Sequence, residues 1–340
     1  MSEELTILVV PRDRFSSLTK CVSSILKYTE KPFRLVVLDF GYTKKQLREM
    51  EAVCGSFPVE VVKMGLTIPM TALKQYLPKV KTKYLAWVDN DTFVTEGWLT
   101  AIMDRVEKGA RVVLPLTLEL EGLGVDPRGI HARNHISHGE LRKVEIEGEE
   151  YVFDFKPYRR AAQAEIPQDG NLTDFFEFHA IFGETEVWRQ LDIPDIVMRE
   201  HIDLGIQLNK LGIPIWCEPK SVVHFANIND RPSIADLKYF HFRWNKKLVE
   251  EAHRVFEERW GYKFMNEQFI KNWAVQRWSF SLFRYCYLPQ KPADFCSRVI
   301  KKLFCKPIPE KFLQDPLPRS ERVLEPLEST AEQPEVSASR

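Results

Sequence analysis

The sequence lacks a long hydrophobic run and any close pair of cysteines. Its six cysteines are scattered without a Cys-x-x-Cys spacing, which argues against a thiolate zinc site and is typical of a reducing compartment. The apolar run Leu5–Val10 is too short for a secretory peptide or a membrane span, and acidic residues precede it. We therefore expect a cytoplasmic chain without a transmembrane helix.

The sequence also lacks an excess of either charge and an early glycine. Lys and Arg together number 48, as do Asp and Glu, so no overall field favours a nucleic-acid partner. No glycine precedes Gly41, so the first predicted strand is not followed by a glycine-rich phosphate loop. The chain has 44% hydrophobic and 28% charged residues, as expected of an ordinary soluble protein with one large or two fused domains.

Short β-branched runs alternate with stretches of helical periodicity in the first third of the chain. The predicted strands are Leu5–Val10, Phe33–Leu38, Val59–Val62, Tyr84–Val88 and Arg111–Leu114. This order implies parallel strands joined by crossover helices. It predicts an α/β fold with a Rossmann-like, mostly parallel central sheet flanked by helices.

Regularity fades after this region. Residues 117–180 contain several glycines and the histidines 131, 135 and 138, and we interpret the segment as an irregular insertion with a solvated histidine loop. Residues 231–305 have helical character, and residues 306–340 are rich in Pro, Glu and Ser, as in a disordered tail. The aromatic-rich helix predicted at 266–287 has two interpretations: packing over the sheet or against a second chain, or contact with a membrane surface.

An acidic motif follows the fourth predicted strand. Asp89, Asn90 and Asp91 come directly after the apolar run Tyr84–Val88. Open α/β sheets bind ligands at the carboxyl ends of their strands, and carboxylates there suit a hard divalent cation that can neutralise a diphosphate. The alternative is that the two acids merely solvate a turn.

Several stretches occur together in a specific order over residues 5–226. They are Val9-Val10-Pro11, Val37–Gly41, Asp89-Asn90-Asp91, Thr95–Leu99, Glu200–Leu204 and Val222–Phe225. This succession resembles the family 2 inverting glycosyltransferases of the GT-A fold. The resemblance implies a GT-A domain over residues 1–230, with residues 117–180 on the acceptor side, a nucleotide-diphosphate sugar donor, and Mn²⁺ or Mg²⁺.

The resemblance also implies roles for individual residues. The donor-binding residues would be Pro11, Arg12, Asp39, Asp89, Asn90 and Asp91. Asp91 would bind the metal directly, Asp89 would lie nearer the ribose or a metal-bound water, and His224 would complete the metal shell. Imidazole suits manganese better than magnesium. Without the resemblance, Asp39 could equally cap a helix and His224 could be a buried, hydrogen-bonded side chain.

The expected catalytic base departs from the family pattern. A Glu-Asp pair opens a helix in the family, whereas this chain has Glu200 and His201. Neutral imidazole has a suitable pKa, so we rank His201 first, Glu200 second and Asp203 third. Asp203 could instead stabilise the start of its helix, and the changed pair could also mark a site that no longer catalyses. His179 is expected to contact the acceptor or to belong to the core.

The sequence therefore predicts metal-dependent, inverting transfer of a sugar from a UDP-sugar to a saccharide or lipid-linked acceptor. A sugar nucleotidyltransferase and a non-catalytic nucleotide-sugar-binding module are the alternatives. The C-terminal helices are expected to allow either self-association or peripheral contact with the inner face of a membrane. No nucleic-acid partner is expected.

Overall fold

The computed structural model describes residues 4–121, 131–226, 234–263, 272, 275, 288–306 and 321–324. The strands of the main sheet are β1 Leu5–Val10, β2 Phe33–Asp39, β3 Val59–Lys63, β4 Tyr84–Asp89, β5 Thr92–Val94, β6 Val112–Glu121, β7 His131–Ile136, β10 Asn171–Thr173, β11 Ala180–Glu184 and β12 Ile215–Ala226. The helices are α1 Leu18–Tyr28, α2 Lys44–Cys54, α3 Pro69–Tyr76, α4 Trp98–Glu107, α5 Thr185–Gln190, α6 Glu200–Lys210, α7 Ile234–Arg243, α8 Lys246–Trp260 and α10 Gln290–Phe304.

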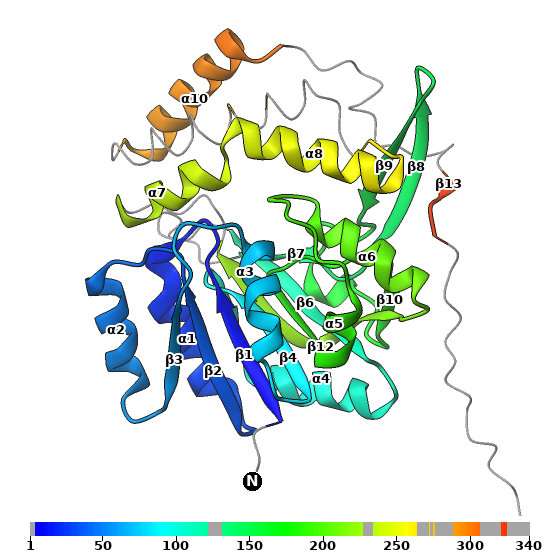
Figure 1. Ribbon diagram of the computed structural model, residues 1–340. Helices are drawn as coiled ribbons and strands as arrows, with labels where there is room; N and C mark the ends of the chain where they lie inside the picture. The colour runs from blue at the N-terminus through cyan, green and yellow to red at the C-terminus, as the bar shows by residue number, and fades with distance from the viewer. Residues whose placement is uncertain are drawn as a thin grey trace, which may run out of the picture.

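The main sheet confirms the predicted α/β architecture. Its order is β10-β12-β6-β11-β4-β1-β2-β3, with β5 paired to β12 and β7 to β6. β1, β2, β3 and β4 run parallel, and β11 is antiparallel to both β4 and β6. β6 and its parallel partner β12 therefore point the same way as β4. The carboxyl ends of six strands thus share one edge of the sheet (Figure 1).

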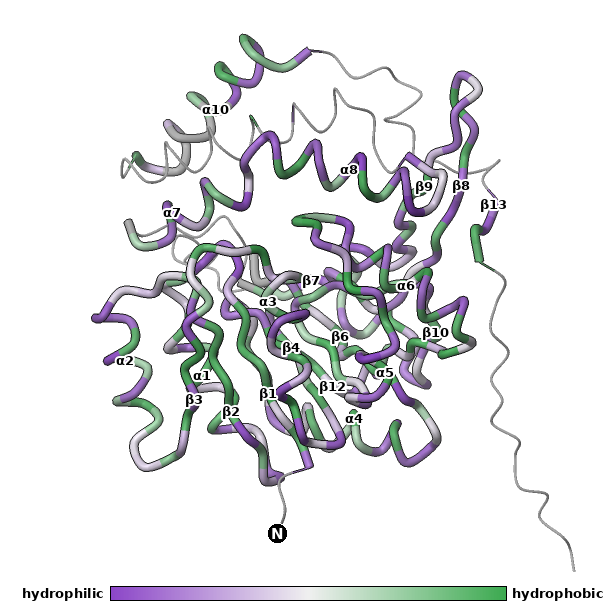
Figure 2. The backbone as a smooth tube through the Cα atoms, in the orientation of Figure 1, coloured by the Kyte–Doolittle hydropathy of each residue, from purple (hydrophilic) through white to green (hydrophobic). Residues whose placement is uncertain are grey.

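The strands form where the sequence is continuously apolar. Every residue of β1 and β4 is buried, as expected of parallel strands with both faces covered. Figure 2 shows the hydrophobic colouring concentrated along the central strands. α1 packs Leu18, Val22 and Ile25 into the core at helical spacing. The five strands predicted from the sequence are all present.

The region predicted to be an irregular insertion contains regular structure. β8 Glu140–Ile146 and β9 Glu149–Phe155 pair as an antiparallel hairpin. Glu147 and Gly148 form its two-residue turn, with φ values of 58° and 80°. Type I′ turns need positive φ at both positions, so Gly148 makes a hairpin rather than breaking a pattern. That glycine was misread in the sequence.

Residues 321–324 also depart from the prediction of a disordered tail. β13 Glu321–Arg322 pairs with β8, and Leu324 is buried in the core. Arg322 Nη2 donates to Asp174 Oδ1 over 2.5 Å. A buried aspartate on the main domain therefore anchors this segment, and the local composition gave no sign of so distant a partner.

α7 and α8 lie across the edge of the sheet at which the parallel strands end (Figure 1). Asp236 of α7 accepts hydrogen bonds from the backbone N and the hydroxyl of Ser16, over 2.8 and 3.0 Å. Arg243 Nη1 donates to buried Asp13 over 2.8 Å. The loop after β1 therefore fixes the first helix of the C-terminal extension.

Asp203 joins α6 to α8. Its carboxylate is fully buried and accepts hydrogen bonds from Arg259 Nε over 2.8 Å and Trp260 Nε1 over 2.7 Å. Gln207 Nε2 donates to its other oxygen over 2.6 Å. Because both oxygens are already paired, the contacts favour an anchoring role for Asp203 between two helices, and its third place among the candidate bases stays a prediction.

Among the described residues, no helix has both the length and the apolar content needed to cross a membrane. α10 nevertheless exposes several large apolar side chains, namely Phe295, Val299, Leu303 and Phe304. Contact with a second chain or a membrane surface was predicted for the aromatic-rich helix at 266–287, which lies outside the described residues except at 272 and 275.

Arg259→Met should lower the free energy of unfolding by about 2 kcal/mol, because it leaves the Asp203 carboxylate buried without its cation. The matched control is Arg254→Met, since Arg254 lies on the same helix but pairs only with exposed acids. The control should leave stability unchanged. Urea unfolding followed by circular dichroism measures both, and equal stabilities would contradict the anchoring role of Asp203.

Candidate active site

The acidic motif closes β4 at the shared edge of the sheet. Asp89 is fully buried, and Asp91 is 2% exposed. Trp87 Nε1 donates to Asp89 Oδ1 over 2.8 Å. Asn90 accepts a hydrogen bond from the backbone N of Arg12 and donates to the backbone O of Arg14. Asn90 thus joins the loop after β1 to the turn after β4. Its role in binding a donor stays a prediction.

The two aspartates are held in an unfavourable setting for two negative charges. Burial raises the pKa of Asp89 well above its ordinary value, with Arg12 opposing the shift and Asp91 adding to it. Burial and the neighbouring Asp13 raise the pKa of Asp91 to about 7, although Arg12 and Arg243 oppose the shift. A divalent cation between the aspartates would relieve this strain.

Asp89, Asp91 and His179 can each offer a ligand atom, and these atoms all lie within 4.8 Å of one another. His179 Nδ1 is 3.7 Å from Asp89 Oδ2. Within the described part of the chain, neither His179 Nδ1 nor Asp91 Oδ1 has a hydrogen-bond partner, although both are buried. Burial and His135 lower the pKa of His179 well below its usual range, so its imidazole is neutral. Two carboxylates and a neutral imidazole fit a divalent cation, and the nitrogen favours manganese over magnesium.

His224 is not brought to the aspartates. It is absent from every group of possible metal ligands that the described residues form. Its neighbour Phe225 stacks on His179 with ring centroids 4.0 Å apart. Because side chains alternate along a strand, His224 points to the other face of β12 from His179. The geometry therefore favours His179 as the nitrogen ligand in place of the predicted His224.

Arg12 links the end of β4 to the start of α6. Its Nε lies 2.8 Å from Asp89 Oδ2, and its Nη1 donates to Glu200 Oε1 over 3.1 Å. Burial opposes the charge of Arg12, but Asp89 and Glu200 outweigh it and raise the pKa of the guanidinium. The residue before Glu200, Arg199, has φ 62°, an uncommon backbone for a non-glycine residue that often marks a functional site.

His201 lies beside Glu200 on the first turn of α6 and is 8% exposed. Its Nε2 is 4.0 Å from Glu177 Oε1 and has no hydrogen-bond partner in the described part of the chain. Burial lowers the pKa of His201, while Glu177 and Glu200 oppose the shift. A neutral imidazole of this kind can accept a proton at neutral pH. Glu200, by contrast, is engaged by Arg12.

Gly205 fixes how close α6 comes to the rest of the site. A Cβ at Gly205 would lie 2.4 Å from the carbonyl oxygen of Asp174 and 3.1 Å from Cα of Phe175. The Phe175 ring lies 6.0 Å from the His201 ring. This close backbone approach therefore sets the position of His201.

Pro11 and Asp39 end the first two strands beside the acidic motif, and both are buried. Asp39 Oδ1 accepts hydrogen bonds from the backbone N of Gly41 and of Tyr42, over 2.8 and 2.7 Å. One carboxylate oxygen therefore shapes the turn after β2. The donor-binding roles of Pro11 and Asp39 stay predictions.

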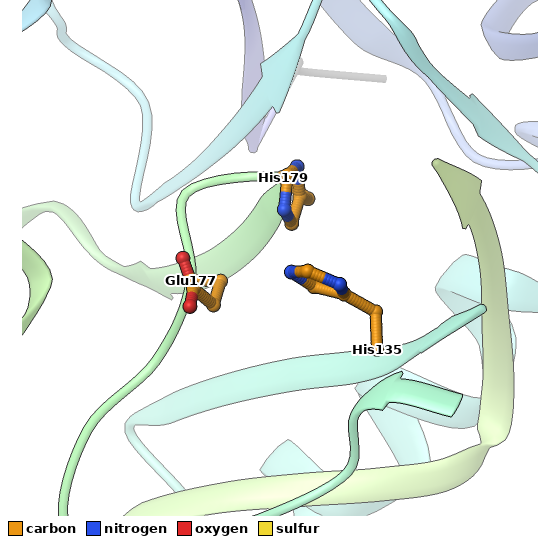
Figure 3. Close-up of side chains that lie close together, drawn as sticks. All are labelled: His135, Glu177 and His179. Atoms are coloured by element: carbon orange, nitrogen blue, oxygen red, sulfur yellow. The ribbon is translucent and has the colours of Figure 1, made fainter. Parts of the chain in front are cut away.

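Two residues of the site were missed in the sequence, and Figure 3 shows them close to His179. His135 was placed in a solvated loop, and Glu177 was not singled out. Glu177 is ion-paired with Lys156. Burial opposes the negative charge of Glu177, but Lys156 and His201 outweigh this effect and hold its pKa well below the ordinary value. No local pattern marks Glu177, because its partners come from distant segments. The spacing of the three histidines also suggests a metal site, but we preferred the solvated loop.

Residues 6–165 match the family model described as glycosyl transferase family 2. No curated protein matches the chain. The structure of GalNAc-T7 with UDP, GalNAc and Mn²⁺ is 14% identical with a TM-score of 0.52, and the match covers 92% of this chain and 56% of that one. The mannosyltransferase PcManGT from Pyrobaculum calidifontis, in complex with GDP-Man and Mn²⁺, is 14% identical with a TM-score of 0.48, covering 89% and 81%.

These identities are low, so the likeness to the first of these structures shows a shared GT-A fold alone. The chain spans 56% of the length of that structure. The fold assignment agrees with the sheet order and with the position of the acidic motif.

Asp91→Asn should stabilise the metal-free protein at pH 8 by about 1–3 kcal/mol. The folded protein holds a proton on Asp91 up to a pKa of about 7, whereas an exposed aspartate loses its proton near pH ~4, so this carboxylate costs more stability as pH rises between these values. The gain should disappear near pH 4. Exposed Asp104 provides the control, Asp104→Asn. Thermal unfolding at both pH values checks the difference, and a destabilised Asp91→Asn protein at pH 8 would contradict it.

Proposed function

The chain carries a glycosyl transferase family 2 domain over residues 6–165, and from this premise we propose that it is a metal-dependent, inverting glycosyltransferase. The proposed donor is a nucleotide-diphosphate sugar, with UDP as the preferred nucleotide. The proposed acceptor is a saccharide or a lipid-linked saccharide.

The group formed by Asp89, Asp91 and His179 is the observation that carries this proposal. It lies at the carboxyl end of β4, where the sheet edge gathers the ends of the parallel strands. A bound divalent cation would supply positive charge against the diphosphate leaving group. Asp91 Oδ1 and His179 Nδ1, both buried without hydrogen-bond partners in the described part of the chain, are the atoms best placed to hold it.

Arg12 prepares the site in two ways. Its guanidinium keeps Asp89 and Glu200 at fixed positions, and its positive charge favours an anionic donor at this edge. The pairing with Arg12 also occupies one oxygen of Glu200, Oε1.

His201 is the proposed base. As the acceptor oxygen forms its bond to the anomeric carbon and the bond to the diphosphate breaks, the hydroxyl proton passes to Nε2 of His201. Glu177, 4.0 Å from that nitrogen, would stabilise the resulting imidazolium. Direct displacement of this kind inverts the anomeric centre. The order His201 before Glu200 matches the ranking made from the sequence.

Asp91→Asn should lower sugar transfer or donor hydrolysis at least about 100-fold, because it weakens the hold on the cation. The assay uses a panel of nucleotide sugars with Mn²⁺, and Asp104→Asn serves as the matched control. Wild-type turnover in Asp91→Asn would remove this residue from the mechanism. Metal-dependent UDP binding in calorimetry without turnover on any acceptor would favour the non-catalytic alternative.

His201→Ala should lower kcat/KM by about 10²–10⁴-fold and should remove the acidic limb of the pH profile. Since the folded protein lowers the pKa of His201 below 6.5, the wild-type rate should rise with pH and level off by neutrality. Glu200→Gln should keep that limb even if its rate falls. A full rate in His201→Ala, or an unchanged acidic limb, would overturn the assignment.

A further inference from the structure

A second group of potential metal ligands lies beside the first. His135 of β7, Glu177 in the segment before β11, and His179 each offer a ligand atom within 4.8 Å of the others. Figure 3 shows the three side chains close together. His135 comes from β7 and the other two side chains come from the segment before β11, so the tertiary fold brings His135 to that segment.

The environment of His135 is typical of a metal-ligating histidine. Its Nδ1 lies 3.8 Å from Glu119 Oε2, and the proximity of His135 lowers the pKa of Glu119. Metal-bound histidines usually direct their second ring nitrogen to a carboxylate in this way, which fixes the tautomer and the ring orientation. The other nitrogen of His135 points toward Glu177 and His179 (Figure 3).

The two imidazole rings of the group are packed against each other. The rings of His135 and His179 meet edge-on with centroids 4.8 Å apart. Phe225 packs on both rings and forms an apolar wall behind the group. Such a wall limits access of water to the ligands.

We propose that His135, Glu177 and His179 form a second metal site that takes a divalent transition-metal ion, with Zn²⁺ as the preferred ion. Two histidines and one carboxylate form the ligand set of many zinc sites that keep a fourth position open. Nitrogen donors disfavour Mg²⁺ and Ca²⁺, and zinc binds such sets more tightly than manganese. The open position would accept water or an oxygen of the acceptor.

The second metal site lies between the aspartate group proposed to hold the first cation and the proposed base His201. His179 is shared with the aspartate group, and Glu177 lies 4.0 Å from the proposed base His201. A zinc ion there would compete for the nitrogen that the aspartates need and would withdraw the anionic partner of His201. The binding claim itself does not rest on the proposed glycosyl transfer, because it is measured without a sugar donor.

The test is titration of the metal-free full chain with Zn²⁺ in calorimetry, supported by the visible spectrum of bound Co²⁺. His135→Gln should weaken Zn²⁺ binding more than about 100-fold, and Glu119→Gln should weaken it about 10–100-fold. His138→Gln provides the matched control, because this neighbouring histidine is outside the group. Asp91→Asn should still bind Zn²⁺ at this site, because Asp91 is not one of its ligands.

Three results would overturn the proposal. They are wild-type Zn²⁺ affinity in His135→Gln, loss of Zn²⁺ binding in Asp91→Asn, and a wild-type protein that binds no Zn²⁺. Circular dichroism establishes that each variant is folded. A measurement independent of variants is anomalous diffraction at the zinc edge from the wild-type protein. A peak bonded to His135 and Glu177 is expected, and a peak at Asp89 and Asp91 alone would contradict the site.

Discussion

The site depends on one buried guanidinium that lies between two carboxylates. Arg12 is 8% exposed, while Asp89 and Glu200 are still more deeply buried. Charges in such a place are tolerated only when they are paired, and removing one partner of a buried pair is costly. The loop after β1, the end of β4 and the start of α6 are therefore bound to one another electrostatically. The positions of Asp91 and His201 follow from that arrangement.

The sequence predicted the parts of this molecule that depend on local patterns. Continuous apolar runs marked β1 and β4, and the position of Asp89 at a strand end marked the functional edge. The sequence did not reveal the direction in which side chains point, or which residues far apart in the chain pair with each other. His224 and Phe225 differ by one residue, and strand alternation decides which of them faces His179. Asp203 looked like a base because its partner Arg259 lies 56 residues away.

The acidic centre is arranged at a cost to stability. Burial and neighbouring charge raise the pKa of Asp91 to about 7, where an exposed aspartate would ionise far lower. Arg12 and Arg243 reduce this penalty without removing it. Unrelieved charge in a buried cleft is common at functional sites, where a ligand supplies the missing compensation. The raised carboxylate pKa values and the ligand atoms without hydrogen-bond partners thus occur together, at the acidic centre.

The contacts of α7 and α8 bear on where this chain can be divided. Asp13 and Asp203 belong to the sheet domain, yet their cationic partners, Arg243 and Arg259, come from the helices beyond residue 230. A polypeptide ending at that boundary would keep both acids in the interior and lose both counterions. Residue 230 is therefore a border in the pattern of the sequence, but buried carboxylates on one side of it are paired with arginines on the other.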